Sequence, residues 1–328
     1  MNVLHVVGGL PTKDQPHYQP FIQSQIDSLI KEDINIEILD LKGYKSPSNY
    51  LTFGKKIKQI VREKSINLIH AHYTYCGFTS LIANTKLPIV LSLMGSDLLG
   101  SPNQKGQIKL RGKFDRLLSH FIVNYVDSVI VKSHRMKVQL NPKVPVNIIP
   151  NGVNFNTFSV TEKSKARYEL GLSQDYFYLL FLGRQNNTVK NYPLAEKSVK
   201  IFINKYRLNN ILLLTPFGIS QETVSKYMNA CDVLLFTSFW EGSPNVVKEA
   251  MACNLPIIST DVGDVKEVIN DTRNCFVVSF SENIIAEKLE SIYSNRERSN
   301  GREKINHLRN DVIAKKIIRI YEKILNRN

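Results

Sequence analysis

Apolar and polar positions follow two alternating periods along this chain. Residues 3–7 form a short apolar run that ends at Gly8-Gly9, which is typical of a buried parallel strand, and residues 21–30 carry apolar side chains at helical spacing. Further strands are predicted in the first half at residues 34–41, 68–72, 89–93 and 129–132. Strands that alternate with helices predict an α/β fold with a parallel sheet covered on both faces.

The alternation is interrupted near the middle of the chain and then restarts. Pro150-Asn151-Gly152, within residues 148–158, is turn chemistry and predicts a domain boundary. Beyond it the pattern predicts strands at residues 178–182, 211–215, 232–237 and 256–260 and helices at residues 193–205, 221–230 and 312–325. With 328 residues the chain is long enough for two domains of roughly 150 residues each.

The segment at residues 239–258, FWEGSPNVVKEAMACNLPII, combines a strand end, a loop of small residues and a helix. Ser243 is predicted to cap this helix by accepting a hydrogen bond from a free backbone N–H, and Pro244 suits the first helical position. Asn254 can adopt the left-handed conformation that ends a helix. Such a helix N-terminus at the carboxyl edge of a parallel sheet favours a phosphate group, because its unpaired N–H groups and its dipole both attract an anion.

Two carboxylates stand eight positions apart in this segment. Glu241 lies in the loop, whereas Glu249 lies inside the predicted helix. A carboxylate accepts hydrogen bonds from vicinal hydroxyls, so Glu249 suits a ribose or sugar diol and the pair could hold the two ends of a sugar nucleotide. The alternative is an ordinary capped helix with a solvent-facing glutamate, since capping signals are common.

The charge is unevenly distributed along the chain. The formal net charge is +14, of which residues 1–155 carry +9 (19 basic minus 10 acidic) and the remainder +5 (24 minus 19). A basic surface favours nucleic acid, anionic lipid or phosphorylated ligands. Because no base-stacking motif or reader module is evident, no nucleic-acid partner is expected.

The cysteines and the apolar runs predict a cytoplasmic protein. The four cysteines form no CxxC pair, which favours reduced core thiols over a zinc site or disulfides. No apolar run approaches the roughly 20 residues that span a bilayer, and the N-terminus lacks the basic region and cleavage site of a signal peptide.

The segment that begins at Glu241 resembles the signature of the retaining glycosyltransferase family 4, whose members have the GT-B fold. The signature places a second glutamate eight positions after the first, here Glu249, in a context like EGSPNVVKEAMACNLPIISTDVG. The likeness runs almost continuously over about 30 residues, from Glu241 to Gly263 and its flanks. Weaker likeness covers most of the chain: the glycine-rich first loop at Gly8-Gly9, the LSLMGSDLL loop at residues 91–99, the PNGV at residues 150–153, and the Gly183-Arg184 … Lys190 element.

The resemblance implies two Rossmann-like domains facing each other across a cleft, with the last helix crossing back to the first domain. The expected domains are residues 1–153 joined by residues 312–328, which bind the acceptor, and residues 154–311, which bind a nucleoside-diphosphate sugar. The implied reaction is sugar transfer with retention of configuration to a glycan or lipid-linked glycan, as in bacterial surface polysaccharide synthesis. The transferred group is expected to be a hexosyl or N-acetylhexosaminyl group.

The family's functional positions map onto named residues of this chain. Arg184 and Lys190 are expected to neutralise the diphosphate leaving group, and Glu241 is expected to bind the transferred sugar. The other donor-binding residues implied are Gly183, Gly242, Ser243, Pro244, Asn245, Val246 and Glu249. The residues implied on the acceptor side are Gly8, Gly9, Met94, Gly95, Ser96 and Asp97.

Two departures from the family pattern bear on these expectations. Met94 stands where family members usually have a histidine that is thought to face the reacting sugar. The stretch at residues 200–225 is shorter, by about one β-α unit, than in larger members of the family. The second sheet is therefore expected to be smaller than in those members.

No metal ion or other cofactor is expected. The resemblance implies no obligatory metal, and the chain has no evident Asp-x-Asp motif. His70 and His72 alternate on a strand end, so at most one is expected to face the cleft, and no third ligand for a metal is evident.

Three further hypotheses stay open. One is a nucleotide-sugar epimerase of the same fold, and another is a non-catalytic partner that binds a sugar nucleotide. The third concerns residues 105–116, where five basic residues alternate with apolar ones. This region could lie on an anionic membrane surface and make the protein peripheral to the membrane, although a solvated helix face is the ordinary alternative.

Overall fold

The computed structural model describes residues 1–42, 48–100 and 107–326, which form two compact units. The first unit contains the described residues up to Gly152 together with those from Asn310 onward, and the second contains Val153–Arg309. The return of the last helix to the first unit was predicted and is confirmed. The division falls within one residue of the first expected boundary and two residues of the second.

The first unit contains a parallel sheet of six strands in the order β2-β1-β3-β4-β5-β6. The strands are β1 (Asn2–Val7), β2 (Asn35–Asp40), β3 (Leu68–His72), β4 (Ile89–Ser92), β5 (Ser128–Val131) and β6 (Val146–Ile148). The helices are α1 (Pro20–Ile30), α2 (Asn49–Thr52), α3 (Gly54–Glu63), α4 (Thr74–Ala83), α5 (Ser96–Leu99), α6 (Leu110–Ile122), α7 (His134–Lys137) and α15 (Asn310–Leu325).

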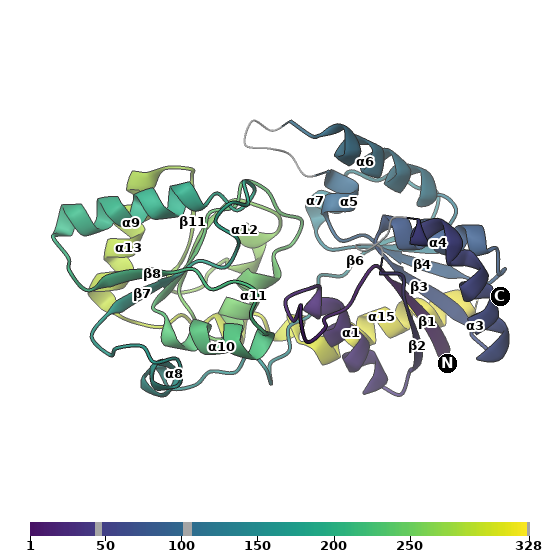
Figure 1. Ribbon diagram of the computed structural model, residues 1–328, viewed down its shortest axis with the longest axis horizontal. Coiled ribbons are helices and arrows are strands. Elements are labelled where there is room, and N and C mark those ends of the chain that lie inside the picture. The colour runs from purple at the N-terminus through teal and green to yellow at the C-terminus, as the bar shows by residue number, and fades with distance from the viewer. Residues whose placement is uncertain (43–47, 101–106, 327–328) are drawn as a thin grey trace. The chain divides into compact units, whose positions relative to one another are not determined.

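Helices cover both faces of this sheet (Figure 1). Alternate strand residues such as Leu4, Val6 and Leu91 form one core with α3, α4 and α6. The opposite face is covered by α1 and α15, which pack against each other. Successive strand residues point to opposite faces, so strands buried on both sides must be apolar almost throughout, and this is the continuous pattern of the sequence.

The second unit contains a parallel sheet of five strands in the order β11-β10-β9-β7-β8. The strands are β7 (Phe177–Leu180), β8 (Ile211–Leu214), β9 (Val233–Phe236), β10 (Ile257–Thr260) and β11 (Cys275–Val278). The helices are α8 (Lys163–Glu169), α9 (Tyr192–Tyr206), α10 (Gln221–Ala230), α11 (Asn245–Ala252), α12 (Val265–Val268), α13 (Glu282–Asn295), α14 (Gly301–Lys304) and the short 3-10 helix η1 (Asn306–Leu308).

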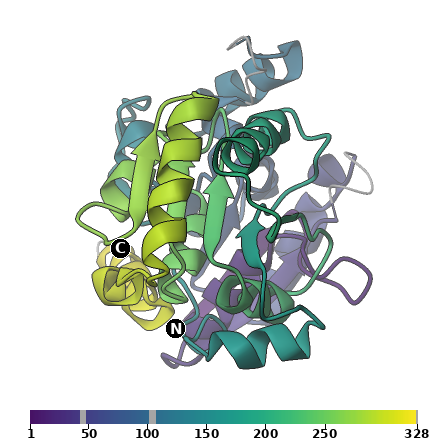
Figure 2. The same cartoon turned by 90° about the vertical axis from the view of Figure 1, so that its left-hand side faces the viewer.

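The helices α9 and α13 lie side by side on one face of the second sheet, and α8 and α10 lie on the other. Figure 2 shows α13, in yellow-green, in front of the strands that it covers. The second sheet has one strand fewer than the first.

Two strands and several helices were missing from the prediction. Both missed strands, β6 and β11, lie at the edge of a sheet, as do the predicted strands β2 and β8, and β6 has three residues. The helix α13 was missed as well, although its buried residues Ile285, Leu289 and Ile292 stand at helical spacing. That spacing is a signal that could have found it.

Candidate functional site

The predicted basic and acidic residues of the donor half meet at the carboxyl ends of β7 and β9. The Lys190 Nζ lies 2.7 Å from the Glu241 Oε1, although the two residues are 51 positions apart. The Ser238 hydroxyl donates to the same carboxylate oxygen at 3.0 Å. Both side chains of the ion pair keep about a quarter or less of their surface exposed, 25% for Lys190 and 21% for Glu241, so the pair can still meet a ligand.

Gly183 and Arg184 follow β7 and lie beside this ion pair. A Cβ on Gly183 would come within 3.1 Å of the Lys190 Cγ, so glycine leaves room for the lysine stem. The Arg184 guanidinium is exposed and lies 4.6 Å from the centre of the Phe217 ring. A cation over an aromatic face is held in place at a modest energy, which leaves its N–H groups available.

The prediction for the start of α11 is wrong in one detail. The helix begins at Asn245 with Pro244 as its N-cap, and no side chain caps it. The Ser243 hydroxyl instead donates to the Asp264 Oδ2 at 2.7 Å and accepts from the Lys248 Nζ at 2.6 Å. The hydroxyl thus bridges these two buried charged groups instead of capping α11.

Lys248 and Asp264 are site residues that sequence reasoning missed. Lys248 is completely buried, and its Nζ lies 3.8 Å from the Asp264 Oδ2. Burial lowers the pKa of Lys248, whereas the neighbouring Asp264 and Glu249 carboxylates oppose that shift. A buried charge needs a partner. The contacts among Ser243, Lys248 and Asp264 therefore fix the loop in front of α11.

Gly263 explains why the signature extends beyond α11. Its φ is +59°, and a Cβ there would lie 2.9 Å from the carbonyl oxygen of Gly242. Only glycine allows the β10–α12 loop to pack so closely on the Gly242–Pro244 loop. Asn254 has a φ of +52° after α11, so its predicted left-handed conformation is confirmed.

Glu249 lies on α11 and is partly buried. Burial raises the pKa of its carboxyl group to about 7, although Lys248 and a hydrogen bond from the Gln221 Nε2 at 3.4 Å both lower it. The long contact from Gln221 is the only hydrogen bond given for the Glu249 side chain among the described residues. The group can therefore accept further hydrogen bonds in its ionised form.

In the first unit the predicted acceptor loop is organised by Asp97. This buried carboxylate accepts hydrogen bonds from the backbone N–H groups of Met94, Gly95 and Leu98 at 2.9–3.2 Å. Burial raises the pKa of Asp97, and these backbone hydrogen bonds oppose the shift. Asp97 therefore holds the loop in shape, and Ser96 is the exposed residue beside it.

The side chain of Met94 is partly buried and packs against an apolar cluster. The cluster is formed by Val7, Ile22 and Ile26 on β1 and α1. A thioether in this position fills apolar space, whereas the family's usual histidine would bring two ring nitrogens to it.

A cavity of about 820 Å³ lies between this loop, α4 and α6. Gly8, Tyr73, Ser96 and Asp115 line it with several other aromatic and apolar side chains: Tyr18, Tyr50, Tyr75, Phe78, Phe114 and Leu118. The Tyr73 hydroxyl lies 3.1 Å from the Ser96 Oγ, and the Tyr75 hydroxyl donates to Asp115. Apolar and aromatic walls with a few fixed polar groups are typical of a site for a small organic ligand. Gly9 is buried next to Gly8 but does not line the cavity.

The interpretation of His70 and His72 is wrong on two counts. Residues two apart on a strand share a face, and the two rings stack 4.2 Å apart. A third histidine, His5, joins them from β1, with its Nδ1 2.9 Å from the His72 Nε2. All three are fully buried beneath α15. The Tyr321 hydroxyl of α15 forms a hydrogen bond with the His70 Nδ1, and the Ser92 Oγ lies 2.8 Å from the His70 Nε2.

These imidazoles form a hydrogen-bonded network. Five of the six ring nitrogens have a partner among the described side chains, and the His72 Nδ1 does not. Burial lowers the pKa of His5 to about 3 and the pKa values of His70 and His72 well below the usual value, so all three are neutral at pH 7.

The basic region predicted at residues 105–116 corresponds largely to α6. Lys105 lies outside the described residues. Apolar side chains are exposed along α6 and just after it: Leu110 (84%), Phe114 (58%), Leu117 (69%), Phe121 (58%) and Tyr125 (60%). Monomeric proteins rarely expose so many large apolar groups together, so the surface is a candidate for contact with a membrane or partner. Among the described residues, no helix is both long and apolar enough to span a bilayer.

Two family models match the chain and together cover most of both units. The model described as Glycosyltransferase Family 4 matches residues 10–157, and the model described as Glycosyl transferases group 1 matches residues 194–307. The second match contains Glu241, Glu249 and Lys248, whereas Gly183, Arg184 and Lys190 lie before it.

Curated relatives of the chain are named as glycosyltransferases. An uncharacterized glycosyltransferase of Methanocaldococcus jannaschii is 27% identical over 328 aligned residues, which cover 85% of this chain and 87% of that protein. The putative teichuronic acid biosynthesis glycosyltransferase TuaC of Bacillus subtilis is 26% identical over 254 residues, which cover 72% of this chain but only 63% of that protein.

Solved structures with the same fold cover nearly the whole chain. A sucrose-phosphate synthase from Thermosynechococcus elongatus matches with a TM-score of 0.80 at 16% identity, with all of both chains covered. The Anabaena protein HepE in complex with UDP matches with a TM-score of 0.71 at 17% identity over 98% of this chain and 100% of that one. The predicted GT-B class, with two Rossmann-like domains, is thereby confirmed.

Proposed function

Because this chain belongs to the group 1 glycosyltransferases of family 4, we propose that it transfers a hexosyl or N-acetylhexosaminyl group from a nucleoside diphosphate to a glycan or lipid-linked glycan, with retention of configuration. The observation that carries the proposal is the ion pair of Lys190 and Glu241 at the carboxyl ends of β7 and β9, four residues before α11 begins. Bacterial surface polysaccharide synthesis is the proposed context, since the relative in Bacillus subtilis is named for teichuronic acid biosynthesis. We place the reaction in the cytoplasm, as expected for a chain whose four cysteines are free.

The departing diphosphate needs positive charge. Lys190 supplies it from within an ion pair, Arg184 supplies it from an exposed position, and the uncapped N–H groups of α11 add hydrogen-bond donors. Positive groups already in place where negative charge develops stabilise a transition state without further reorganisation. These groups provide the charge without a metal ion, and none is part of the proposal.

Glu241 and Glu249 have separate roles in this proposal. Glu241 is held by Lys190 and Ser238, so one carboxylate oxygen is fixed and the other can face hydroxyls of the transferred sugar. Glu249 lies eight positions further along the chain, within α11, and accepts from the ribose hydroxyls. The HepE structures with UDP, and with UDP-glucose, support a nucleotide sugar as the donor of a protein with this fold.

The tyrosine-lined cavity of the first unit is the proposed acceptor site. It is lined by Gly8 and Ser96, two of the residues expected on the acceptor side, and its fixed polar groups are Tyr73 and Asp115. Phe114 and Leu118 of α6 form part of its wall. The exposed apolar stripe of α6 therefore begins at the acceptor cavity, which supports a lipid-linked acceptor that reaches the protein from a membrane surface.

The donor site is tested with UDP-, GDP-, ADP- and dTDP-sugars, followed by the fluorescence of Trp240, the single tryptophan, which lies next to Glu241. We expect one donor to bind, and we expect Arg184→Ala and Glu249→Gln to weaken it at least tenfold. Glu267→Gln, a matched change on the exposed face of α12, should leave affinity unchanged. Failure of every donor to bind the folded protein would refute the donor site.

The pH dependence of binding isolates Glu249. Its carboxyl group, with a pKa of about 7, is mostly protonated at pH 6 and mostly ionised at pH 8. Hydroxyl donors prefer the ionised form, so donor affinity should rise about tenfold over this range and Glu249→Gln should abolish the rise. Product analysis with and without acceptor then separates transfer from epimerisation and from binding without turnover.

The membrane contact is tested by sedimentation with vesicles that contain phosphatidylglycerol. Leu117→Ser with Phe121→Ser should reduce binding, because it removes exposed apolar area from α6. Val160→Ser with Tyr168→Ser, which removes exposed apolar area from the second unit, is the control. Equal binding by both variants would exclude α6 as the contact.

A further inference from the structure

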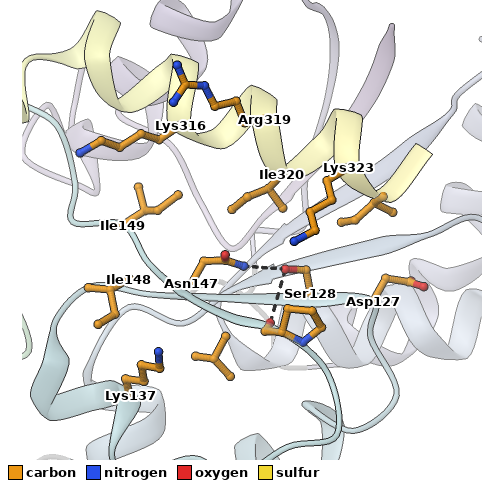
Figure 3. A pocket seen from close by; sticks show the side chains of 13 residues that line it. Asp127, Ser128, Lys137, Asn147, Ile148, Ile149, Lys316, Arg319, Ile320 and Lys323 are labelled. Carbon is orange, nitrogen blue, oxygen red and sulfur yellow. Dashed lines mark hydrogen bonds between the residues drawn. The ribbon is translucent and has the colours of Figure 1, made fainter. Parts of the chain in front are cut away.

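A second cavity of the first unit, of about 510 Å³, lies between the edge strand β6 and the helix α15 (Figure 3). Its lining includes Asp127 and Ser128, where β5 begins, and Pro145 and Val146, where β6 begins. It also includes Ile148 and Ile149, where β6 ends, so the cavity runs along the length of β6. The cavity shares no lining residue with the proposed acceptor cavity.

Four cationic side chains surround the cavity. Lys137 contributes from α7, and Lys316, Arg319 and Lys323 contribute from α15 at helical spacings of three and four. In Figure 3 the ammonium groups of Lys137 and Lys323 point into the space between α15 and β6, whereas the Arg319 guanidinium points away from it. The structure thus brings together charges that are about 180 positions apart in the sequence.

These four cations have no counterion among the described residues. In the part of the chain that the structure describes, no ion pair or hydrogen bond is given for any of the four. Their neighbour Lys315, which lies outside the cavity, does have a partner, with its Nζ 3.7 Å from a Glu32 carboxylate oxygen. Like charges in one concavity repel one another, so a bound anion would be favoured there.

The one acid in the lining is already committed to the fold. The Asp127 Oδ2 accepts a hydrogen bond from the backbone N–H of Ile89 at 2.7 Å, at the start of β4. It therefore cannot neutralise four cations. The polar pair Ser128 and Asn147, joined at 2.9 Å, lies at the bottom of the cavity and offers further hydrogen-bonding groups.

The edge of β6 adds backbone donors. The Pro145 carbonyl accepts from the Val129 N–H, and the Ile149 N–H donates to the Val131 carbonyl, both at 2.9 Å. Backbone groups alternate in direction along a strand, so Val146 and Ile148 direct theirs away from β5, toward the open edge. The aliphatic residues Ile149, Ile320 and Ile324 complete the floor.

From this arrangement we infer that the cavity between β6 and α15 is a binding site for a phosphate-bearing ligand, separate from the donor and acceptor sites. A phosphate monoester or diphosphate carries the two or more negative charges that several lysines and an arginine can neutralise, whereas a carboxylate carries one. The aliphatic floor differs from the tyrosine walls of the acceptor cavity and favours an apolar group next to the phosphate over a sugar ring. Such a phosphate could belong to a lipid headgroup or to a soluble compound.

The test compares two triple variants of the whole chain. One replaces the three cavity lysines, K137Q/K316Q/K323Q. The other, K165Q/K197Q/K304Q, replaces three exposed lysines of the second unit and lowers the net charge equally. Inorganic pyrophosphate, titrated calorimetrically at 150 mM salt, represents a soluble source, and vesicles that contain phosphatidic acid, a phosphate monoester, compared with phosphatidylcholine vesicles, represent a lipid source. Saturating UDP is added in a parallel titration to occupy the donor site.

We expect the cavity variant, and not the control variant, to lose a binding event that UDP does not compete with. Loss of at least tenfold in pyrophosphate affinity identifies a soluble phosphate as a sufficient ligand. Loss confined to the anionic vesicles identifies a lipid headgroup. Equal binding by the two variants in both arms would overturn the inference. The net charge of the protein, and not the position of the cavity lysines, would then account for the binding. Because UDP and the donor variants report on the other unit, failure here leaves the proposed transfer reaction untouched.

Discussion

The two units stabilise their buried polar side chains in opposite ways. Under α15 the first unit buries His5, His70 and His72 as neutral groups that bond one another and Tyr321. At the start of β9 the second unit instead buries an ion pair, in which the Arg167 guanidinium lies 2.8 Å from Asp232.

The difference follows from the charged and hydrogen-bonding groups that surround each buried side chain. Asp232 also accepts from the Tyr178 backbone N–H at 2.7 Å and from Lys163 at 2.7 Å, so its charge is fully surrounded by donors. The histidines have no such counterion, and burial keeps them uncharged. A neutral network is therefore sensitive to added protons, whereas an ion pair is sensitive to the loss of either partner.

The largest effect is expected from breaking the ion pair. Asp232→Ala leaves the Arg167 guanidinium, with 6% of its side chain exposed, without its carboxylate, and should cost about 3–5 kcal/mol of unfolding free energy. Urea unfolding followed by Trp240 fluorescence measures it, since this tryptophan belongs to the second unit.

The same pair offers an internal control. The double change Arg167→Met with Asp232→Leu removes both charges and should cost less than Asp232→Ala alone. Glu196→Gln, which breaks an exposed pair with Lys200 on α9, should cost less than about 0.5 kcal/mol. A double variant less stable than the single one would show that the pair contributes net stability.

A smaller effect is expected from acid on the first unit. The folded pKa of His5 is lowered to about 3, against the ordinary 6.5 of the unfolded chain, so the unfolded state binds more protons between these values. Stability is therefore complete above about pH 6.5 and falls as the pH decreases through this window, by about 2 kcal/mol at pH 5 for each histidine that stays neutral.

Two probes separate the units in this titration. Far-UV circular dichroism reports on both units, and Trp240 fluorescence reports on the second. We expect the dichroism to change at a higher pH than the fluorescence. Coincident transitions would contradict the assignment of acid sensitivity to the histidine network.

The smallest effect is expected from the link between α15 and the network. Tyr321→Phe removes the hydroxyl that bonds the His70 Nδ1 and should cost about 1 kcal/mol in unfolding free energy at pH 8. Tyr168→Phe, the same change at a side chain that is 84% exposed, is the matched control. If both variants unfold alike in urea, the hydroxyl does not help to hold α15.

Much of the fold was predictable because parallel strands buried on both faces leave a continuous apolar run. The strand β6 escaped prediction because its three residues leave too short a pattern, whereas β11 was missed although Cys275–Val278 is an apolar run. In the donor half, Lys190 and Glu241 were both predicted as site residues, but their 2.7 Å contact was not, because 51 residues separate them. Lys248 was missed because a lysine inside a helix is ordinarily solvated.

The sequence alone determined the alternation of strands and helices with nine of the eleven strands in the described residues, the signature from Glu241 to Gly263 and the excess of basic residues in the first half. These features are local, since they depend on residue type and spacing along the chain. Tertiary structure decided the third histidine of the buried network, the partner of the Ser243 hydroxyl and the gathering of Lys137 with Lys323 around one cavity. Each of these depends on which strands become neighbours and where α15 packs, and those contacts join residues too distant in sequence for any local pattern to record.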